Sequence, residues 1–132
     1  MMNLSLIIAV GSGGALGAIT RMLVNGFAAK NLSNYLPYGT IIVNLSGSFI
    51  IGVLFAYFHH HPTLSPHVKS FLATGFVGAL TTYSTFAIES FFLLESGRFF
   101  QAFSNITINL IGTIALSALG YLLVIQFYKI NI

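Results

Sequence analysis

Residues 75–89 read GFVGALTTYSTFAIE, and this stretch interrupts an otherwise apolar segment with two glycines, four Ser and Thr hydroxyls and one carboxylate. Backbone at membrane depth must hydrogen-bond within the protein, so non-helical chain survives there only where it is buried or lines a cavity. Hydroxyls such as those of Ser84 and Thr85 can satisfy freed backbone groups and still face a solute. The stretch therefore predicts a broken membrane helix at the centre of a permeation protein. The alternative is an unbroken helix whose Ser and Thr side chains bond back to their own turn.

The composition places the whole chain in a membrane. Only 5% of the 132 residues are charged, where a soluble domain has about 25%, and 56% are hydrophobic. The absence of cysteine excludes disulfide and thiolate chemistry. Four runs without Asp, Glu, Lys or Arg are each long enough for a helix of the roughly 20 residues that cross a bilayer. These runs are residues 1–20, 31–68, 70–88 and 99–128.

Each charge-free run supports one membrane span. We therefore expect an all-α integral membrane protein, built as a single domain over residues 1–132. Four close-packed helices have side chains in the middle and enclose no wide pore, so the protein is expected to form oligomers. The expected spans cover about residues 4–27, 40–58, 69–94 and 99–126.

The first two spans carry small and polar residues that a lipid-facing helix does not need. Gly13 and Gly17 form a GxxxG pair, and small residues at this spacing let membrane helices approach closely. Arg21 either reaches the membrane surface with its long stem or anchors another segment with its guanidinium. Asn44, in the second span, must use its donors and its acceptor to be tolerated in hydrocarbon. It belongs either to a solute pathway or to an interhelical hydrogen bond.

The fourth span repeats a polar residue at every fourth position. In a helix this period stacks the side chains on one slowly winding face that is roughly 18 Å long. Two amides and two hydroxyls in one register predict a polar track for a solute; the alternative is that they join helices by hydrogen bonds. The members of this track are Asn105, Asn109, Thr113 and Ser117.

Two other polar features admit more than one interpretation. Glu89 is the only acid deep within a span and is a functional candidate by default. The alternatives to contact with a solute are protonation or a hydrogen bond across helices. The run His59, His60 and His61 has the composition of a metal site. However, Pro62 breaks any helix that would present the imidazoles on one face, so we expect a solvated loop at the membrane surface.

The cations give almost no preference for one orientation in the membrane. If the chain crosses four times, Lys69 and Lys129 lie on one side, and Lys30 and Arg98 lie on the other, with Arg21 near them. Orientation normally follows an excess of Lys and Arg in cytoplasmic loops. Because neither side has a clear excess, the chain is expected to insert both ways, which favours an antiparallel dimer.

Taken in order, these residues resemble the Fluc (CrcB-type) family of bacterial fluoride ion channels. The resemblance lies in all four spans, at the family's spacing and total length. The chain departs from the family's pattern at Tyr83, where Phe is usual, and at Ala79, where a second Gly is usual. The matching motifs are Gly13-Gly14 with Arg21, Gly39-Thr40-x-x-x-Asn44-x-x-Gly47, Gly78-x-Leu80-Thr81-Thr82-Tyr83-Ser84-Thr85-Phe86-x-x-Glu89, and Asn109-x-x-Gly112.

The resemblance implies a dual-topology homodimer in the bacterial cytoplasmic (inner) membrane, with fluoride passing passively through two pores along the subunit interface. It implies a structural Na⁺ held by the backbone carbonyls of Gly78 and Thr81. The ring edges of Tyr83 and Phe86 would face the anion, and Asn44 and the polar track of the fourth span would line its pathway. Structural roles in helix packing are expected for Gly13, Gly17, Arg21, Gly47 and Glu89.

The residues also fit this chemistry on their own. Fluoride holds its water tightly, so a pore must replace that water with donors. Uncharged Asn, Ser and Thr do so without binding the ion too tightly to release it. A small dual-topology, proton-coupled multidrug exporter is one rival, but residues 1–27 contain no acid to exchange protons. A non-conducting membrane scaffold is a second rival, but it would not need aligned hydrogen-bond donors. An enzyme is not indicated, because the sequence shows no nucleophile–base pair and no set of metal ligands.

Overall fold

The computed structural model describes residues 3–131, and all regular structure in that range is helical. The chain forms four long helical segments, of which the third and fourth are assembled from shorter pieces. The first two are α1 (Leu4–Asn31) and α2 (Tyr38–His60). The third consists of α3 (Pro66–Lys69), the π-helical segment η1 (Ser70–Val77), α4 (Gly78–Leu80) and α5 (Tyr83–Glu95). The fourth consists of α6 (Phe99–Thr107), the π-helical segment η2 (Ile108–Gly112) and α7 (Thr113–Ile130).

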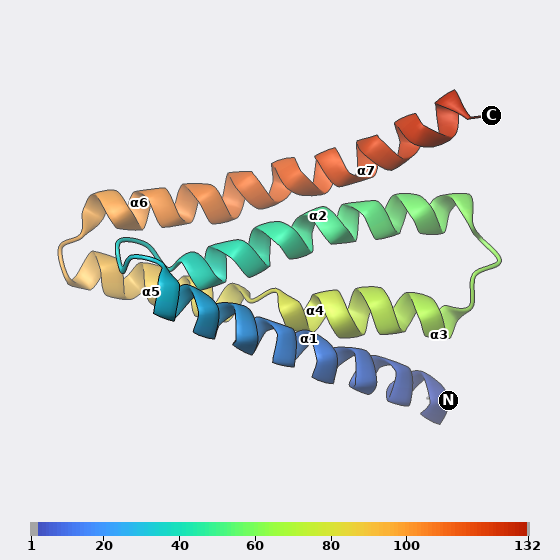
Figure 1. The fold of residues 1–132 in the computed structure, drawn as a ribbon, viewed down its shortest axis with the longest axis horizontal. Coiled ribbons are helices and arrows are strands. Elements are labelled where there is room, and N and C mark those ends of the chain that lie inside the picture. Colours follow the sequence, from blue (N-terminus) through green and yellow to red (C-terminus); the bar gives the residue numbers. More distant parts are fainter. Residues whose placement is uncertain (1–2, 132) are drawn as a thin grey trace.

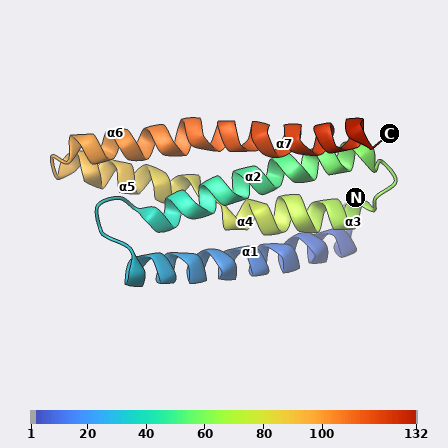
Figure 2. The same cartoon turned by 45° about the horizontal axis from the view of Figure 1, so that its top comes forward.

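The four segments lie side by side and alternate in direction, so both ends of the chain and the loop after α2 share one end of the bundle (Figure 1). Figure 2 shows α1 on one side and α6–α7 on the other, with α2 and the third segment between them. All four segments are long and apolar enough to cross a bilayer. The protein is therefore an all-helical, multi-pass membrane protein.

The helices extend beyond the spans expected from the sequence. α1 continues to Asn31 and α2 to His60, rather than ending near residues 27 and 58, and α7 continues to Ile130 rather than residue 126. Hydrophobicity indicates where a helix leaves the apolar layer of the membrane. The helix itself can extend further, because its backbone hydrogen bonds also form outside that layer. The loop expected from residue 59 onward is therefore wrong at its start, because His59 and His60 form the last turn of α2.

The turn between α5 and α6 is set by Gly97, the one residue within 3–131 with a positive φ, 74°. Its N–H donates to the carbonyl of Leu94 at 3.0 Å, and the N–H of Arg98 donates to the carbonyl of Leu93 at 2.8 Å. These two bonds form a Schellman motif, which favours glycine because it needs left-handed backbone. The Arg98 guanidinium then donates to the carbonyl of Tyr35 at 2.8 Å and ties this turn to the loop between α1 and α2.

Glycines bring α1 against the first half of the third segment. A Cβ atom on Gly13 would meet the carbonyl of Phe71, and one on Gly17 would meet the carbonyl of Phe76. On the facing side, a Cβ on Gly75 would lie 3.0 Å from the Cα of Gly13. The two backbones touch with no side chain between them, which is the packing that a GxxxG pair predicts.

A second glycine contact joins α2 to α7. A Cβ on Gly52 would meet the carbonyl of Ser117, and a Cβ on Gly120 would meet the carbonyl of Phe49. Ala56, one turn further along α2, has no exposed surface. The two helices therefore cross with their backbones in contact, and this crossing fixes the spacing between α2 and the fourth segment.

The outside of the bundle is strongly apolar. Large side chains such as Leu4, Phe103 and Ile130 are between 69% and 72% exposed. Contiguous apolar surface of this kind marks contact with lipid or with another protein. The few fully buried side chains include the polar Asn105. Several polar side chains, among them those of Asn44, Asn105 and Asn109, are therefore buried inside an otherwise apolar bundle.

Candidate functional site

The third segment leaves helical geometry at Thr81 and Thr82, where the backbone is extended. φ and ψ are −80° and 155° at Thr81 and −149° and 110° at Thr82. α4 ends just before this pair and α5 begins just after it. An uninterrupted helix would direct the N–H of Thr82 to the carbonyl of Gly78. That N–H instead donates to Oδ1 of Asn44 on α2 at 2.7 Å, so the Gly78 carbonyl loses its helical partner.

Asn44 holds the extended pair with both ends of its side-chain amide. Besides accepting the bond from the Thr82 N–H, it donates from Nδ2 to the Thr82 carbonyl at 3.1 Å and to Oδ1 of Asn109 at 2.8 Å. The side chain is buried, and its donors and its acceptor are all used. Hydrogen bonds of this kind make a buried amide tolerable. The interhelical hydrogen bond considered for Asn44 is therefore present.

A chain of hydrogen bonds continues from Asn109 toward the end of the bundle at which α5 and α6 are joined. Nδ2 of Asn109 donates to both the carbonyl and Oδ1 of Asn105, each at 3.0 Å. Asn105 in turn donates to Oγ of Ser90 at 3.0 Å, and Ser90 donates to the carbonyl of Phe86 at 2.8 Å. The chain links α2, η2, α6 and α5. Because each buried member has a partner, the network holds these side chains in fixed positions.

Two further contacts fix the ends of the extended pair. Oγ1 of Thr82 accepts a hydrogen bond from the N–H of Thr85 at 3.3 Å and donates to Oγ1 of Thr85 at 2.9 Å, so Thr82 is the N-cap of α5. On the other side, Nη1 of Arg21 on α1 donates to the carbonyl of Thr81 at 3.3 Å. Arg21 therefore anchors another segment with its guanidinium, which is one of the two roles that its position in the sequence allows.

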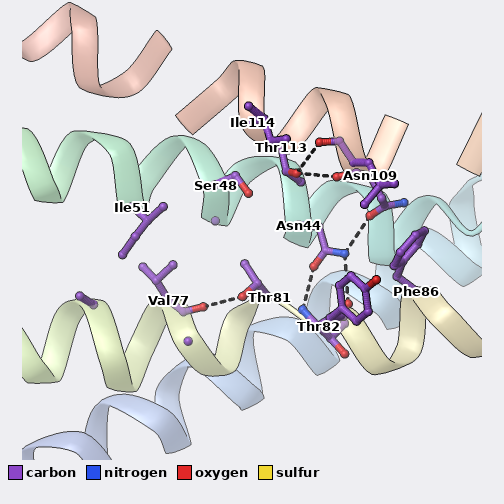
Figure 3. A pocket seen from close by; sticks show the side chains of 15 residues that line it. Asn44, Ser48, Ile51, Val77, Thr81, Thr82, Phe86, Asn109, Thr113 and Ile114 are labelled. Atoms are coloured by element: carbon purple, nitrogen blue, oxygen red, sulfur yellow. Dashed lines mark hydrogen bonds between the residues drawn. The ribbon is translucent and has the colours of Figure 1, made fainter. Parts of the chain in front are cut away.

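A cavity of about 480 Å³ lies beside the extended pair, between α2, the third segment and the fourth segment (Figure 3). Its walls combine amides and hydroxyls with apolar groups, and among the described residues no Asp, Glu, Lys or Arg lines it. It is therefore uncharged but able to form hydrogen bonds. The lining residues are Asn44, Gly47, Ser48, Ile51, Ala73, Val77, Gly78, Thr81, Thr82, Tyr83, Phe86, Asn109, Leu110, Thr113 and Ile114.

Tyr83 and Phe86 bring two aromatic rings to this cavity. Their ring centroids are 5.3 Å apart and their planes are inclined by 71°, which is an edge-to-face arrangement. Phe86 is only 6% exposed, whereas Tyr83 is 73% exposed. A ring edge carries the positive end of the aromatic quadrupole, so an edge that borders a cavity attracts an anion weakly.

Some residues singled out from the sequence lie outside this cavity. Asn105 is behind its wall in the hydrogen-bond chain, and Ser84 and Thr85 do not line it. Ser117 donates to the carbonyl of Ser48 at 3.0 Å and thereby joins α7 to α2. The residues that the cavity does bring together are Asn44, Gly47, Gly78, Thr81, Tyr83, Phe86, Asn109 and Thr113.

Sequence reasoning missed Ser48 as a member of the cavity wall. It follows Asn44 by four residues, so it lies on the same face of α2 one turn later, and that spacing was the available signal. A second omission is the backbone role of Thr82, whose N–H and carbonyl both bond to Asn44. No pattern in one sequence shows which residue of another helix will lie opposite.

Glu89 lies away from this cavity and borders a second one of about 280 Å³, together with Asn25 and Thr40. The hydroxyl of Thr40 donates to Oε1 of Glu89 at 2.9 Å. Within residues 3–131, Oε2 of Glu89 and Oδ1 of Asn25 are buried without a hydrogen-bond partner. The hydrogen bond across helices that the sequence left open for Glu89 is present.

The histidine run packs against the end of α7. His60 stacks on Tyr128 with ring centroids 4.0 Å apart, and Nε2 of His61 is hydrogen-bonded to the Tyr128 hydroxyl at 2.7 Å. Over residues 3–131, no three His, Cys, Asp or Glu side chains are grouped as they would be around a metal ion. These imidazoles therefore join α2 to α7 at the shared end of the bundle.

Four segments able to cross a membrane, with an uncharged cavity of amides and hydroxyls among them, define a small multi-pass membrane protein with a polar site inside its helix bundle. The chain belongs to the CrcB family. The family model described as "CrcB-like protein, Camphor Resistance (CrcB)" matches residues 8–121.

Curated relatives resemble the chain over almost its whole length. A protein of Sulfurimonas denitrificans named "Fluoride-specific ion channel FluC" is 50% identical over 123 residues, which are 93% of this chain and 95% of the relative. Proteins with the same name from Nitratiruptor and from Campylobacter fetus are each 42% identical, over 96% of this chain. The matched region spans 98% of the Nitratiruptor protein and 99% of the Campylobacter fetus protein.

Proposed function

We propose that the protein is a fluoride-specific ion channel that lets fluoride leave the cell passively and so lowers cytoplasmic fluoride. The observation that carries the proposal is the uncharged cavity of amides, hydroxyls and aromatic rings inside a membrane-crossing bundle. The shared name of the relatives supports fluoride as the ion. The protein acts as a channel and not as an enzyme.

The chemistry of the walls suits a small anion that binds water tightly. Uncharged polar groups replace the water of hydration, and because they carry no formal charge the ion can leave again. The ring edges of Tyr83 and Phe86 add a weak attraction for the anion. The proposed pathway comprises Asn44, Tyr83, Phe86, Asn109 and Thr113, with Ser84, Thr85, Asn105 and Ser117 along the same route.

The working unit is an antiparallel homodimer in the bacterial cytoplasmic membrane, with two pores along the subunit interface. The exposed Tyr83 ring supports this, because a second copy would cover its apolar surface. The charges support insertion both ways. Lys30 and Arg98 lie at one end of the bundle, with Arg21 nearer to them, and Lys69 and Lys129 lie at the other, so neither end has a clear excess.

The extended pair at Thr81 and Thr82 serves as a helix break that holds a structural Na⁺ where the two copies meet. The carbonyl of Gly78 fits this role, because its helical donor is bonded to Asn44 instead. Oxygen ligands suit hard cations. The carbonyl of Thr81 already accepts a hydrogen bond from Arg21, so Na⁺ binding requires this oxygen to be shared or released. Two antiparallel copies would supply these carbonyls from both sides.

A fluoride-electrode assay tests the channel. Liposomes that contain the purified protein are loaded with potassium fluoride, and valinomycin is added to carry the balancing K⁺. Fast fluoride release without a proton gradient supports the proposal, provided that chloride-loaded liposomes release their anion far more slowly. Release that requires a proton gradient would indicate a coupled exporter, and no release would indicate a scaffold.

The antiparallel dimer has its own test. The chain contains no cysteine, so a single introduced thiol can be labelled selectively. Thr63→Cys places one in the exposed loop after α2. If the chain inserts both ways, an impermeant maleimide labels about half of the protein in intact cells and the remainder after lysis. Complete labelling, or none, in intact cells would contradict dual topology.

The Na⁺ site is tested by stability rather than by transport. The melting temperature of the purified dimer in NaCl is compared with that in the chloride of a large organic cation at the same ionic strength. A higher melting temperature in Na⁺ supports the site, because a ligand that binds only the folded dimer stabilises it. Equal melting temperatures over a wide range of Na⁺ concentration would rule it out.

A further inference from the structure

The amides on the cavity wall already use their N–H groups within the subunit. Nδ2 of Asn44 donates to the carbonyl of Thr82 and to Oδ1 of Asn109, and Nδ2 of Asn109 donates to two oxygens of Asn105. An anion that reaches either amide must displace one of these bonds. A buried oxygen is then left without its donor, which is unfavourable.

The threonine hydroxyls on the wall are occupied in the same way. Thr81 donates to the carbonyl of Val77 at 3.2 Å, and Thr82 donates to the hydroxyl of Thr85 at 2.9 Å. Thr113 donates to a carbonyl one turn earlier in its own helix. These protons satisfy protein oxygens, so a solute in the cavity does not find them free.

Two lining hydroxyls differ from all of these. Among residues 3–131, the hydroxyls of Ser48 and Tyr83 form no hydrogen bond, and Figure 3 draws Ser48 on the cavity wall without one. The carbonyl of Ser48 accepts the bond from Ser117, so the backbone is held in place while the hydroxyl stays free. A hydroxyl rotates about its C–O bond and can therefore donate to whatever enters.

We propose that the hydroxyls of Ser48 and Tyr83 are the donors that contact the permeating anion directly, whereas Asn44 and Asn109 hold the cavity in shape. This assignment rests on the proposed function as a fluoride channel. A free hydroxyl binds the ion without giving up another bond, and a hydrogen bond to an ion is stronger than one between neutral groups. The two donors come from different elements, α2 and α5, so the contact does not depend on one helix alone.

Ser48→Ala in the liposome assay is the central test. It removes the free hydroxyl and keeps the helix, and the initial rate of fluoride release is expected to fall about tenfold, as for the loss of one hydrogen bond to an ion. Ser48→Thr keeps a hydroxyl and should retain most of the rate. The matched control is Ser46→Ala on the same helix. Oγ of Ser46 donates to the carbonyl of Ile42 at 2.6 Å, outside the cavity, so this variant should match the wild type.

Tyr83→Phe provides an independent measurement, because it removes only the hydroxyl and keeps the ring edge. We expect a rate several-fold below that of the wild type, with a higher fluoride concentration needed for half-maximal rate. The double variant of Ser48→Ala with Tyr83→Phe should be slower than either single variant. Size-exclusion chromatography of every variant shows whether the oligomer is intact.

The outcomes distinguish a failure of the hydroxyl assignment from a failure of the proposed channel function. If the wild type releases no fluoride, the channel proposal itself fails. If the wild type is active and both Ser48→Ala and Tyr83→Phe are equally fast, the two hydroxyls do not contact the ion and the assignment is overturned. An equal loss in Ser46→Ala would also overturn it, because the effect would then belong to α2 in general. Should Ser48→Ala fail to assemble, Tyr83→Phe decides alone.

Discussion

Asn44 and Thr82 are paired as two residues of a β-sheet would be, although one partner is a side chain. The amide of Asn44 accepts from the Thr82 N–H at 2.7 Å and donates to the Thr82 carbonyl at 3.1 Å. A carboxamide has the same donor and acceptor as a peptide group, so it can replace the backbone partners that an extended residue lacks inside a helix bundle. The extended geometry at Thr82 therefore depends on a residue 38 positions earlier.

Asn44→Asp is expected to abolish fluoride release, with a rate at least about a hundredfold below the wild type. Aspartate has no N–H, so the Thr82 carbonyl and Oδ1 of Asn109 lose their donor, and a negative charge is buried beside an anion pathway. The liposome assay measures the rate. The matched control is Asn31→Asp, where the amide is exposed at the end of α1 and donates only to the carbonyl of Phe27. Wild-type release by Asn44→Asp would show that conduction does not depend on the hydrogen bonds that the Asn44 amide donates.

Phe86→Ile is expected to reduce fluoride release by about tenfold or more. Isoleucine fills much of the buried volume but has no ring edge to attract an anion, and it removes the edge-to-face contact with Tyr83 at 5.3 Å. Phe127→Ile is the control, because Phe127 is 63% exposed near the far end of α7. Initial rates in the two variants are compared at equal amounts of reconstituted protein. Equal rates would show that the Phe86 ring takes no part in conduction.

Gly17→Ala should prevent assembly, whereas Gly11→Ala should be tolerated. A Cβ on Gly17 would meet the backbone carbonyl of Phe76, which cannot move aside as a flexible side chain can, and overpacking of this kind costs about 1–3 kcal/mol or more. Gly11 has nothing within 4 Å of the same atom. The yield and the elution volume of the detergent-solubilised protein measure the difference. A Gly17→Ala protein with wild-type yield would mean that α1 does not pack against the third segment as described.

Gly97→Ala should lower the stability of the fold without changing conduction. The φ of 74° at this position disfavours any residue with a Cβ by about 1 kcal/mol, although the surrounding space is open. Gly26→Ala is the opposite case, because it lies within α1 with no atom within 4 Å of an added Cβ, so alanine should be neutral or stabilising. Melting temperatures of the purified variants compare the two. A lower melting temperature for Gly26→Ala than for Gly97→Ala would contradict this account of the turn.

Sequence predicted those features that depend on local chemistry. The absence of charge in four long runs predicted the membrane-crossing helices, which the structure contains. The turn after α5 is also local, because the φ of 74° at Gly97 is a conformation that favours glycine whatever lies opposite. Helix α1 runs beyond its expected membrane span, to Asn31, because hydrophobicity reports the thickness of the membrane and not the full length of a helix.

The sequence did not predict features that depend on pairing between distant segments of the chain. The four-residue period predicted that Asn109, Thr113 and Ser117 share a face, but it did not show where their donors are directed. Thr113 bonds within its own turn, whereas Ser117 reaches the carbonyl of Ser48 on another helix. The four-residue spacing from Asn44 placed Ser48 on the same face of α2, but it did not show that the hydroxyl of Ser48 is free. That information requires the packed structure.

The close backbone packing of α2 against α7 at Gly52 and Gly120 limits how the molecule can move. At these two glycines the backbones of α2 and α7 are in direct contact, with no side chains between them. Tightly packed interiors of this kind transmit strain, so the two helices do not slide easily past each other. A gate that works by shifting one of these helices past the other would have to break this contact. The fluoride permeability of the membrane is then expected to depend on the number of protein copies that the cell makes, and not on a gate that moves α2 against α7.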